Sequence, residues 1–220
     1  MGRIARVVAS GLPHHITQRG NRRQQTFYYD EDYRAYIGLM AEWCNQCKVE
    51  VWAYCLMPNH THMIAVPESE EGLRRAIGEA HRRYTRRVNF REGWKGHLWQ
   101  GRFASFPMDG RYLLAATRYV ELNPVRAKLS VRPEGYAWSS AGAHMRGEDD
   151  RLARVGPLLG LVKDWGEFLL GGMRDKEATE LRRSERTGRP LGDEGFLRKL
   201  GGGLGRILHA GKPGRKRSGK

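Results

Sequence analysis

The sequence predicts an α+β fold with a ferredoxin-like β-α-β-β-α-β order, an antiparallel sheet, helices on one face, and an additional C-terminal helix carrying a tyrosine. Three observations lead to this prediction. Short segments rich in β-branched and aromatic residues alternate with longer segments of helical periodicity. The pair Pro58-Asn59 is typical of a turn joining two strands into a hairpin. The pair Asn123-Pro124 is expected to stop the last helix.

The first half of the pattern contains a strand, a helix and a hairpin. Residues 14–18 (HHITQ) form a short predicted strand that ends at a turn-like Arg-Gly-Asn. Residues 30–46 place apolar side chains at helical spacing. Residues 49–57 (VEVWAYCLM) and 60–66 (HTHMIAV) are the two strands of the hairpin.

The second half contains a long helix, a fourth strand and the additional helix. Residues 72–91 place Leu73, Ile77, Tyr84 and Val88 on one helical face. Residues 102–108 (RFASFPM) predict a short strand, and its proline favours an edge position. Asp109 is placed to cap a helix that runs to about Leu122.

The composition favours a polyanionic partner. Among 220 residues, 39 Lys+Arg against 24 Asp+Glu give a net charge of +15, which favours nucleic acid over a membrane surface. No apolar run is long enough to span a bilayer, no hydrophobic signal core begins the chain, and three cysteines cannot form a closed disulfide framework. We therefore expect a cytoplasmic, nucleoid-associated protein without a membrane partner.

The positive charge is concentrated near the C-terminus. Residues 182–220 carry twelve Lys+Arg, three Asp+Glu and ten glycines. We expect a basic, mostly flexible tail there, in which a short helix is possible around residues 196–200 or 204–209. The tail either aids solubility or binds phosphates through residues such as Arg215, Lys216 and Arg217. The remaining chain divides into a domain over residues 1–140, which contains the predicted sheet, and a helical extension over residues 141–181.

Two pairs of polar residues could carry chemistry. His60 and His62 point to the same face of a strand, where two imidazoles can chelate a divalent metal, although an exposed histidine pair is the more common reading of such a pattern. Tyr119 and Asn123 lie one helical turn apart. A helical tyrosine is usually a packing residue, but a phenol can attack phosphorus when a metal polarises the phosphate, and the amide of Asn123 could be a further ligand.

The long helix presents a row of arginines opposite its apolar face. This arginine ridge is either a solvated surface or a site for DNA phosphates, and few acids neutralise it; its members are Arg74, Arg75, Arg82, Arg83, Arg86, Arg87 and Arg91. A rival metal site would combine Cys44 and Cys47 with the two histidines as in a zinc finger, but the spacing between the histidines is too short for that motif.

Several motifs together resemble a known family. They are residues 14–22 (HHITQRGNR), 57–66 (MPNHTHMIAV), 99–103 (WQGRF), 118–127 (RYVELNPVRA) and 187–191 (TGRPL). The first four, in this order over about residues 3–140, resemble the single-tyrosine HUH (IS200-like) transposases and, more narrowly, the REP-associated tyrosine transposases. Residues 187–191 also resemble this narrower branch.

The resemblance implies a metal-dependent endonuclease and strand transferase acting on single-stranded or hairpin-forming repetitive DNA. His60 and His62 would bind Mg²⁺ or Mn²⁺, and Tyr119 would form a 5′-phosphotyrosine link. Asn123 stands where better-known relatives have a glutamine ligand, and Thr61 stands where they have an apolar residue. A monomer or a homodimer is expected, and the alternative function is a catalytically silent DNA-binding protein or regulator on the same fold.

Overall fold

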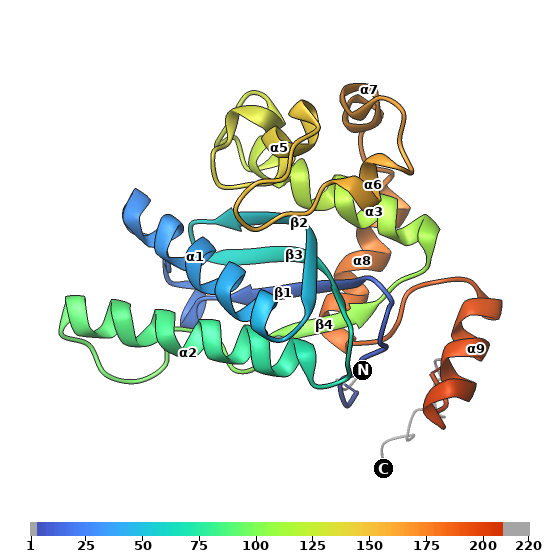
Figure 1. The fold of residues 1–220 in the computed structure, drawn as a ribbon, viewed down its shortest axis with the longest axis horizontal. Coiled ribbons are helices and arrows are strands. Elements are labelled where there is room, and N and C mark those ends of the chain that lie inside the picture. Colours follow the sequence, from blue (N-terminus) through green and yellow to red (C-terminus); the bar gives the residue numbers. More distant parts are fainter. Residues whose placement is uncertain (1–3, 209–220) are drawn as a thin grey trace, which may run out of the picture.

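A four-stranded antiparallel sheet organises residues 4–208, which a computed structural model describes (Figure 1). The strands are β1 (His14–Arg19), β2 (Val49–Met57), β3 (His60–Pro67) and β4 (Ala104–Pro107), in the spatial order β2-β3-β1-β4. The ferredoxin-like prediction is confirmed, and the predicted strand bounds agree with the observed ones to within two residues.

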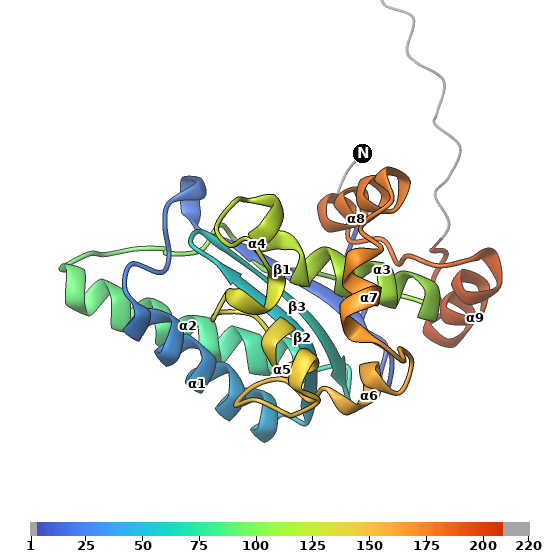
Figure 2. The same cartoon turned by 90° about the horizontal axis from the view of Figure 1, so that it is seen from above.

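The two helices of the ferredoxin pattern cover one face of the sheet. They are α1 (Asp30–Gln46) and α2 (Gly72–Glu92), which pack on the sheet through a core that includes Tyr36, Met40 and Tyr84. Figure 2 shows both helices on the same side of the strands. Strand alternation sends Met63 and Ala65 of β3 into this core, so His62 and Ile64 face the other way.

The opposite face is covered by helices from the second half of the chain (Figure 2). Asp109 begins α3 (Gly110–Glu121) by accepting a hydrogen bond from the backbone N–H of Tyr112, as the sequence predicts. Its apolar residues form a second core with Ile64, with Trp165 of α7 (Trp165–Leu170) and with Leu181 of α8 (Asp175–Thr187). The shorter helices of this half are α4 (Asn123–Arg126), α5 (Ala141–Arg146) and α6 (Gly156–Leu159).

The late segments also close both edges of the sheet. Residues 138–154 run along β2, where the Trp138 carbonyl accepts from Leu56 and the Val51 carbonyl accepts from Arg154. At the other edge Leu191 donates its backbone N–H to the carbonyl of Pro107 in β4. Covered edges do not offer free strand groups to other chains.

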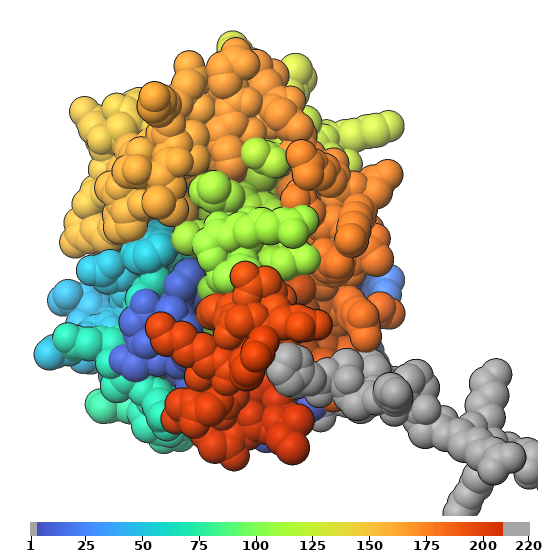
Figure 3. Space-filling view, turned by 90° about the vertical axis from the view of Figure 1, so that its right-hand side faces the viewer, coloured from blue at the N-terminus to red at the C-terminus, as the bar shows by residue number. Residues whose placement is uncertain are grey.

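The predicted boundary at residue 182 does not follow the helices. It falls inside α8, and residues 194–204 form α9 (Glu194–Leu204), whose Leu200 packs with Val7 and Ala9. Figure 3 shows α9 against the N-terminal segment and beside α3. Residues 182–208 thus contain the end of α8 and all of α9, where the sequence predicted at most one short helix: composition emphasised glycine and charge, whereas buried Ala178, Leu181 and Ser184 hold α8 in place.

Candidate active site

The predicted histidines lie on the sheet face that α3 and α8 cover. In the β1–β3 register His15 pairs with Ile64 and Thr17 pairs with His62, so His15 shares the face of Ile64 and His62. The His15 and His62 rings stack with their centroids 5.3 Å apart, and Nε2 of His15 is hydrogen-bonded to Nδ1 of His62 at 3.1 Å. The ring of His60 lies 5.1 Å from that of His62.

Tyr119 reaches this histidine cluster from α3. Its ring centroid lies 5.5 Å from that of His62 and 6.1 Å from that of His15, in edge-on contacts. The side chain is 7% exposed because α3 packs its apolar face on the sheet. The structure therefore brings together the tyrosine and both histidines that the sequence singled out.

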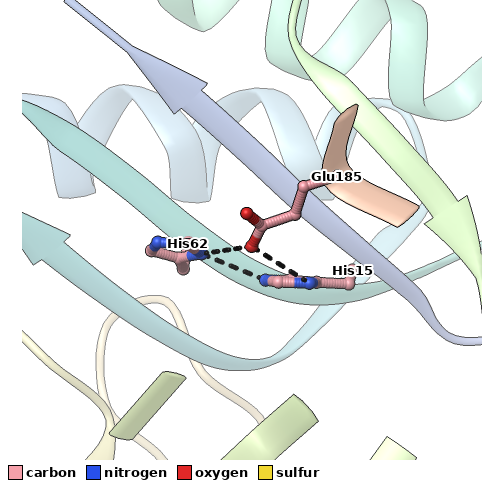
Figure 4. Close-up of side chains that lie close together, drawn as sticks. All are labelled: His15, His62 and Glu185. Atoms are coloured by element: carbon pink, nitrogen blue, oxygen red, sulfur yellow. Dashed lines mark hydrogen bonds and ion pairs between the residues drawn. The ribbon is translucent and has the colours of Figure 1, made fainter. Parts of the chain in front are cut away.

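A carboxylate from α8 lies beside the same histidines (Figure 4). Oε1 of Glu185 is 3.7 Å from Nδ1 of His62 and 3.9 Å from Nδ1 of His15. The ligand atoms of these three residues lie within 4.8 Å of one another. Sequence reasoning missed both His15 and Glu185.

Burial sets the protonation of this cluster. It lowers the pKa of His15 to about 3 and that of His62 well below its ordinary value. Burial, reinforced by the charge of Arg19, lowers the pKa of His60 to about 4. The imidazoles are therefore neutral at neutral pH, which is the form that binds a metal. Burial also raises the pKa of Glu185 to about 7, against the opposing charges of nearby arginines.

Three arginines surround the cluster. Arg19, Arg182 and Arg126 each lower the pKa of Glu185 by their charge. The guanidinium carbon of Arg126 lies 4.1 Å from the centroid of the Tyr119 ring. A guanidinium in this position can stabilise negative charge on a phenolate or on a phosphate beside it.

Asn123 begins α4, one turn beyond Tyr119. The residue is 9% exposed, and its amide nitrogen has no hydrogen-bond partner among the described residues. Pro124 follows directly in the first turn of this short helix, which also carries Arg126.

Glu121 anchors the end of α3 next to Tyr119. Its fully buried carboxylate accepts hydrogen bonds from Ser140 Oγ at 2.6 Å and from Trp165 Nε1 at 2.9 Å, and lies 2.7 Å from Nδ1 of His144. These partners come from residues 139–170, a region whose elements the sequence pattern left unplaced. Glu121 thus joins the tyrosine helix to the helical extension.

The arginine ridge lies on the other side of the sheet. All seven of its members are exposed on α2, which covers the face opposite to Tyr119 and the histidines. Glu71 and Glu79 pair with Arg74 and Arg82, and Arg91 forms an ion pair with the buried Asp32 of α1. The structure therefore does not bring the ridge to the histidine–tyrosine cluster. Arg215, Lys216 and Arg217 lie outside the described residues.

The zinc-finger alternative is wrong for the described part of the chain. Cys44 and Cys47 are buried in the core under α1, whereas His60 and His62 face the opposite side of the sheet. Within residues 4–208 no group of metal-binding side chains includes a cysteine. No helix among those residues has the length and apolarity needed to cross a membrane.

Two solved structures align with the chain. A structure of a REP-associated tyrosine transposase bound to a REP hairpin aligns with a TM-score of 0.54 at 20% identity, over 70% of this chain and 93% of the other. A protein of Deinococcus radiodurans R1, provisionally assigned as a transposase, aligns with a TM-score of 0.39 at 18% identity, over 54% and 95% of the two chains. Among curated proteins, none matches the chain.

Family membership follows from the sequence. The family model described as "Transposase IS200 like" matches residues 8–123, which is more than half of the chain and includes every strand, both histidines of β3, and Tyr119. The chain therefore belongs to the IS200-like transposase family.

Proposed function

We propose that the chain is a metal-dependent single-stranded DNA endonuclease and strand transferase in which Tyr119 becomes covalently joined to a DNA 5′ phosphate. The main support is the 5.5 Å separation between the Tyr119 and His62 rings, which come from a late helix and a mid-sheet strand. A phenol used only for packing would not need buried neutral imidazoles beside it, because burying such polar rings is costly.

Bond changes in the proposed reaction balance within one phosphodiester. The Tyr119 oxygen loses its proton and forms a bond to phosphorus, while the bond from phosphorus to the 3′ oxygen breaks and a 3′-OH is released. The energy of the phosphodiester is retained in the tyrosine link, so a later 3′-OH can reverse the step and join a new strand. The guanidinium of Arg126, which lies over the Tyr119 ring, would stabilise negative charge during this exchange.

The residues at the site fit a divalent cation. Nδ1 of His15 and Oε1 of Glu185 are buried without a hydrogen-bond partner among the described residues, although they face each other across 3.9 Å. In the set proposed from the sequence, His60, His62 and Asn123 would hold Mg²⁺ or Mn²⁺. The bound cation would draw charge from the scissile phosphate.

The proposed substrate is hairpin-forming repetitive DNA. Support comes from the family and from the aligned transposase, which is bound to a REP hairpin. The excess of positive charge is consistent with a nucleic-acid partner. The exposed arginine ridge on α2 would contact DNA that extends beyond the active-site face of the sheet.

A denaturation-resistant adduct tests the proposal. The protein is incubated with Mn²⁺ and single-stranded DNA containing a repetitive hairpin, and the products are separated under denaturing conditions. We expect a protein–DNA adduct that is absent in Tyr119→Phe and retained in Tyr112→Phe, a control two turns earlier on α3 whose hydroxyl bonds to Glu180. Binding without adduct across several metals and hairpins would instead indicate a catalytically silent DNA-binding protein.

A further inference from the structure

One of the two ring nitrogens of His62 is already engaged by the protein. Its Nδ1 is hydrogen-bonded to Nε2 of His15 at 3.1 Å, and Oε1 of Glu185 lies 3.7 Å away. Its Nε2 lies on the opposite side of the ring (Figure 4). We propose that His15 is a positioning residue, which holds His62 in the orientation and tautomer that present Nε2 to the divalent cation, and that Glu185 in turn holds His15. This inference rests on the metal dependence proposed above and keeps His60 and His62 as ligands.

The positions of the ring protons follow from metal binding. A neutral imidazole has one N–H and one lone pair, so His62 can offer the lone pair of Nε2 only when its proton is on Nδ1. That N–H then donates to His15, whose Nε2 must accept, and the proton of His15 is therefore on Nδ1. This nitrogen and Oε1 of Glu185 are both buried without a hydrogen-bond partner among the described residues, and they lie 3.9 Å apart. A shift of about 1 Å would complete a chain from the cation to the carboxylate.

His60 is held in the same tautomer by a different partner. Its Nδ1 lies 2.6 Å from Oδ1 of Asn59, an amide oxygen that can only accept, so Nδ1 donates and Nε2 keeps its lone pair. Both histidines of β3 can thus offer Nε2 to one cation. Metal-binding histidines generally donate their other ring N–H to such an acceptor, and loss of the acceptor typically weakens metal binding by about 10–100-fold.

The sheet fixes His15 in the place that this role requires. Strand β1 lies between β3 and β4, and His15 pairs with Ile64 on one side and Phe106 on the other. Its side chain is fully buried and lies edge-on to the Phe106 ring. The planes of the His15 and His62 rings are inclined by 20°, and the excess of the 5.3 Å centroid separation over the 3.1 Å hydrogen bond matches the two ring radii. The bond therefore runs along the line between the ring centres, which is the direction of an imidazole N–H.

Binding of Mn²⁺ to the metal-free full-length protein tests this role without any catalysis. Free Mn²⁺ is measured by electron paramagnetic resonance during a titration. His15→Leu removes the acceptor, whereas His15→Gln places an amide oxygen close to the position of Nε2. We expect His15→Leu to weaken Mn²⁺ binding at least about tenfold and His15→Gln to stay within about threefold of the wild type. A role in packing alone predicts the reverse order, because a buried amide costs more than a buried apolar side chain.

Glu185 lies one step further from the cation than His15. Glu185→Leu removes the acceptor for Nδ1 of His15 and should weaken Mn²⁺ binding about threefold. Glu180→Leu, a matched change on α8, should leave the affinity unchanged. Nitrogen couplings to the bound Mn²⁺ should count the two imidazoles of His60 and His62 in the wild type and in His15→Gln. Loss of a coupling in His15→Gln would make His15 a ligand and overturn the proposal.

Nuclear magnetic resonance of isotope-labelled histidine reads the tautomers directly. In the Mg²⁺-loaded wild type we expect the protons of His15 and His62 on Nδ1, with signals assigned from His15→Gln and His62→Gln. A proton on Nε2 of His15 would overturn the proposal, as would a folded His15→Leu variant that binds Mn²⁺ within about twofold of the wild type. Circular dichroism shows whether each variant is folded, and the wild-type tautomers decide the question if His15→Leu does not fold.

The two proposals fail in different ways. A Tyr119-dependent DNA adduct together with normal Mn²⁺ binding by folded His15→Leu refutes only the positioning role. Absence of the adduct together with His15-dependent Mn²⁺ binding refutes the nuclease and keeps the positioning role. Failure of the wild type to bind Mn²⁺ at millimolar concentration refutes both the positioning role and metal dependence.

Discussion

Removal of the buried Glu121 carboxylate should destabilise the fold far more than neutralisation of the exposed Glu42 on α1. Three buried groups depend on that carboxylate: the Ser140 hydroxyl, the His144 ring and the Trp165 indole N–H, at 2.6, 2.7 and 2.9 Å. Leaving a buried donor without a partner costs about 1–3 kcal/mol, and breaking a buried charged network costs about 3–5 kcal/mol. We therefore expect Glu121→Ala to lower the free energy of unfolding by about 4 kcal/mol.

Glu121→Gln separates shape from charge. The amide keeps the volume of the carboxylate but replaces one acceptor oxygen with a donor, so one of the three donors loses its partner at a cost of about 2 kcal/mol. Glu42→Gln, an exposed change on α1, should stay within about 0.5 kcal/mol of the wild type. Urea denaturation followed by circular dichroism gives all three values. A loss below about 1 kcal/mol for Glu121→Ala would refute the claim that this network anchors α3.

Three further outcomes are expected. Acidification from pH 6.5 towards pH 4 in EDTA should lower the free energy of unfolding. Burial lowers the pKa of His81 to about 3 and that of His14 to about 4. Both histidines take up protons near pH 6.5 when the chain is unfolded, so acid stabilises the unfolded state relative to the folded one. Each adds a loss of about 1.4 kcal/mol per pH unit in that window, and an unchanged urea midpoint between pH 7 and 5 would contradict this. Arg126→Gln should slow adduct formation about tenfold or more, whereas Arg111→Gln, which loses a similar contact with an α3 tyrosine ring, should not; equal rates would argue against a role for the guanidinium. Deletion of residues 209–220, which carry five Lys+Arg and no Asp+Glu, should weaken DNA binding and retain adduct formation. The slope of log binding constant against log salt concentration should become shallower by up to about 3. An unchanged slope would show that these residues do not contact DNA phosphates.

Local patterns were sufficient to predict the sheet and its first helices. The β-branched and aromatic residues of 49–57 and 60–66 predicted strands, which the structure buries on both faces, and the helical period in residues 30–46 reflects burial of one face of α1. The alternation of side chains along a strand placed His60 and His62 on one face. The approach of Tyr119 to them depended on α3 covering that face, which the motif resemblance indicated and spacing alone did not.

His15 and Glu185 were missed for different physical reasons. The pairing of two adjacent histidines in residues 14–18 with the strand of His62 could have shown that one of them must share its face. Glu185 carried no such signal, because the buried face of α8 uses the small residues Ala178 and Ser184 and the helix runs into the basic stretch 182–220. Leu181 is the one large apolar side chain on that face, so composition suggested a tail from residue 182 onwards.

Glu121 illustrates a third kind of miss. An acid in the last turn of a helix opposes the helix dipole, and that unfavourable placement is itself a sequence signal that another interaction holds it. The partners, however, come from loops and short helices between residues 139 and 170, where no regular period exists. Their positions depend on tertiary packing rather than on local preference.

The most direct test of the account is to identify the residue that is joined to DNA. Trypsin should release residues 119–126 (YVELNPVR), a peptide in which Tyr119 is the sole tyrosine. After reaction with hairpin DNA and nuclease digestion, mass spectrometry should find this peptide carrying a nucleotide through its tyrosine. Cleaved DNA with the nucleotide on any other peptide, or with no protein link, would contradict the central claim that Tyr119 is the nucleophile.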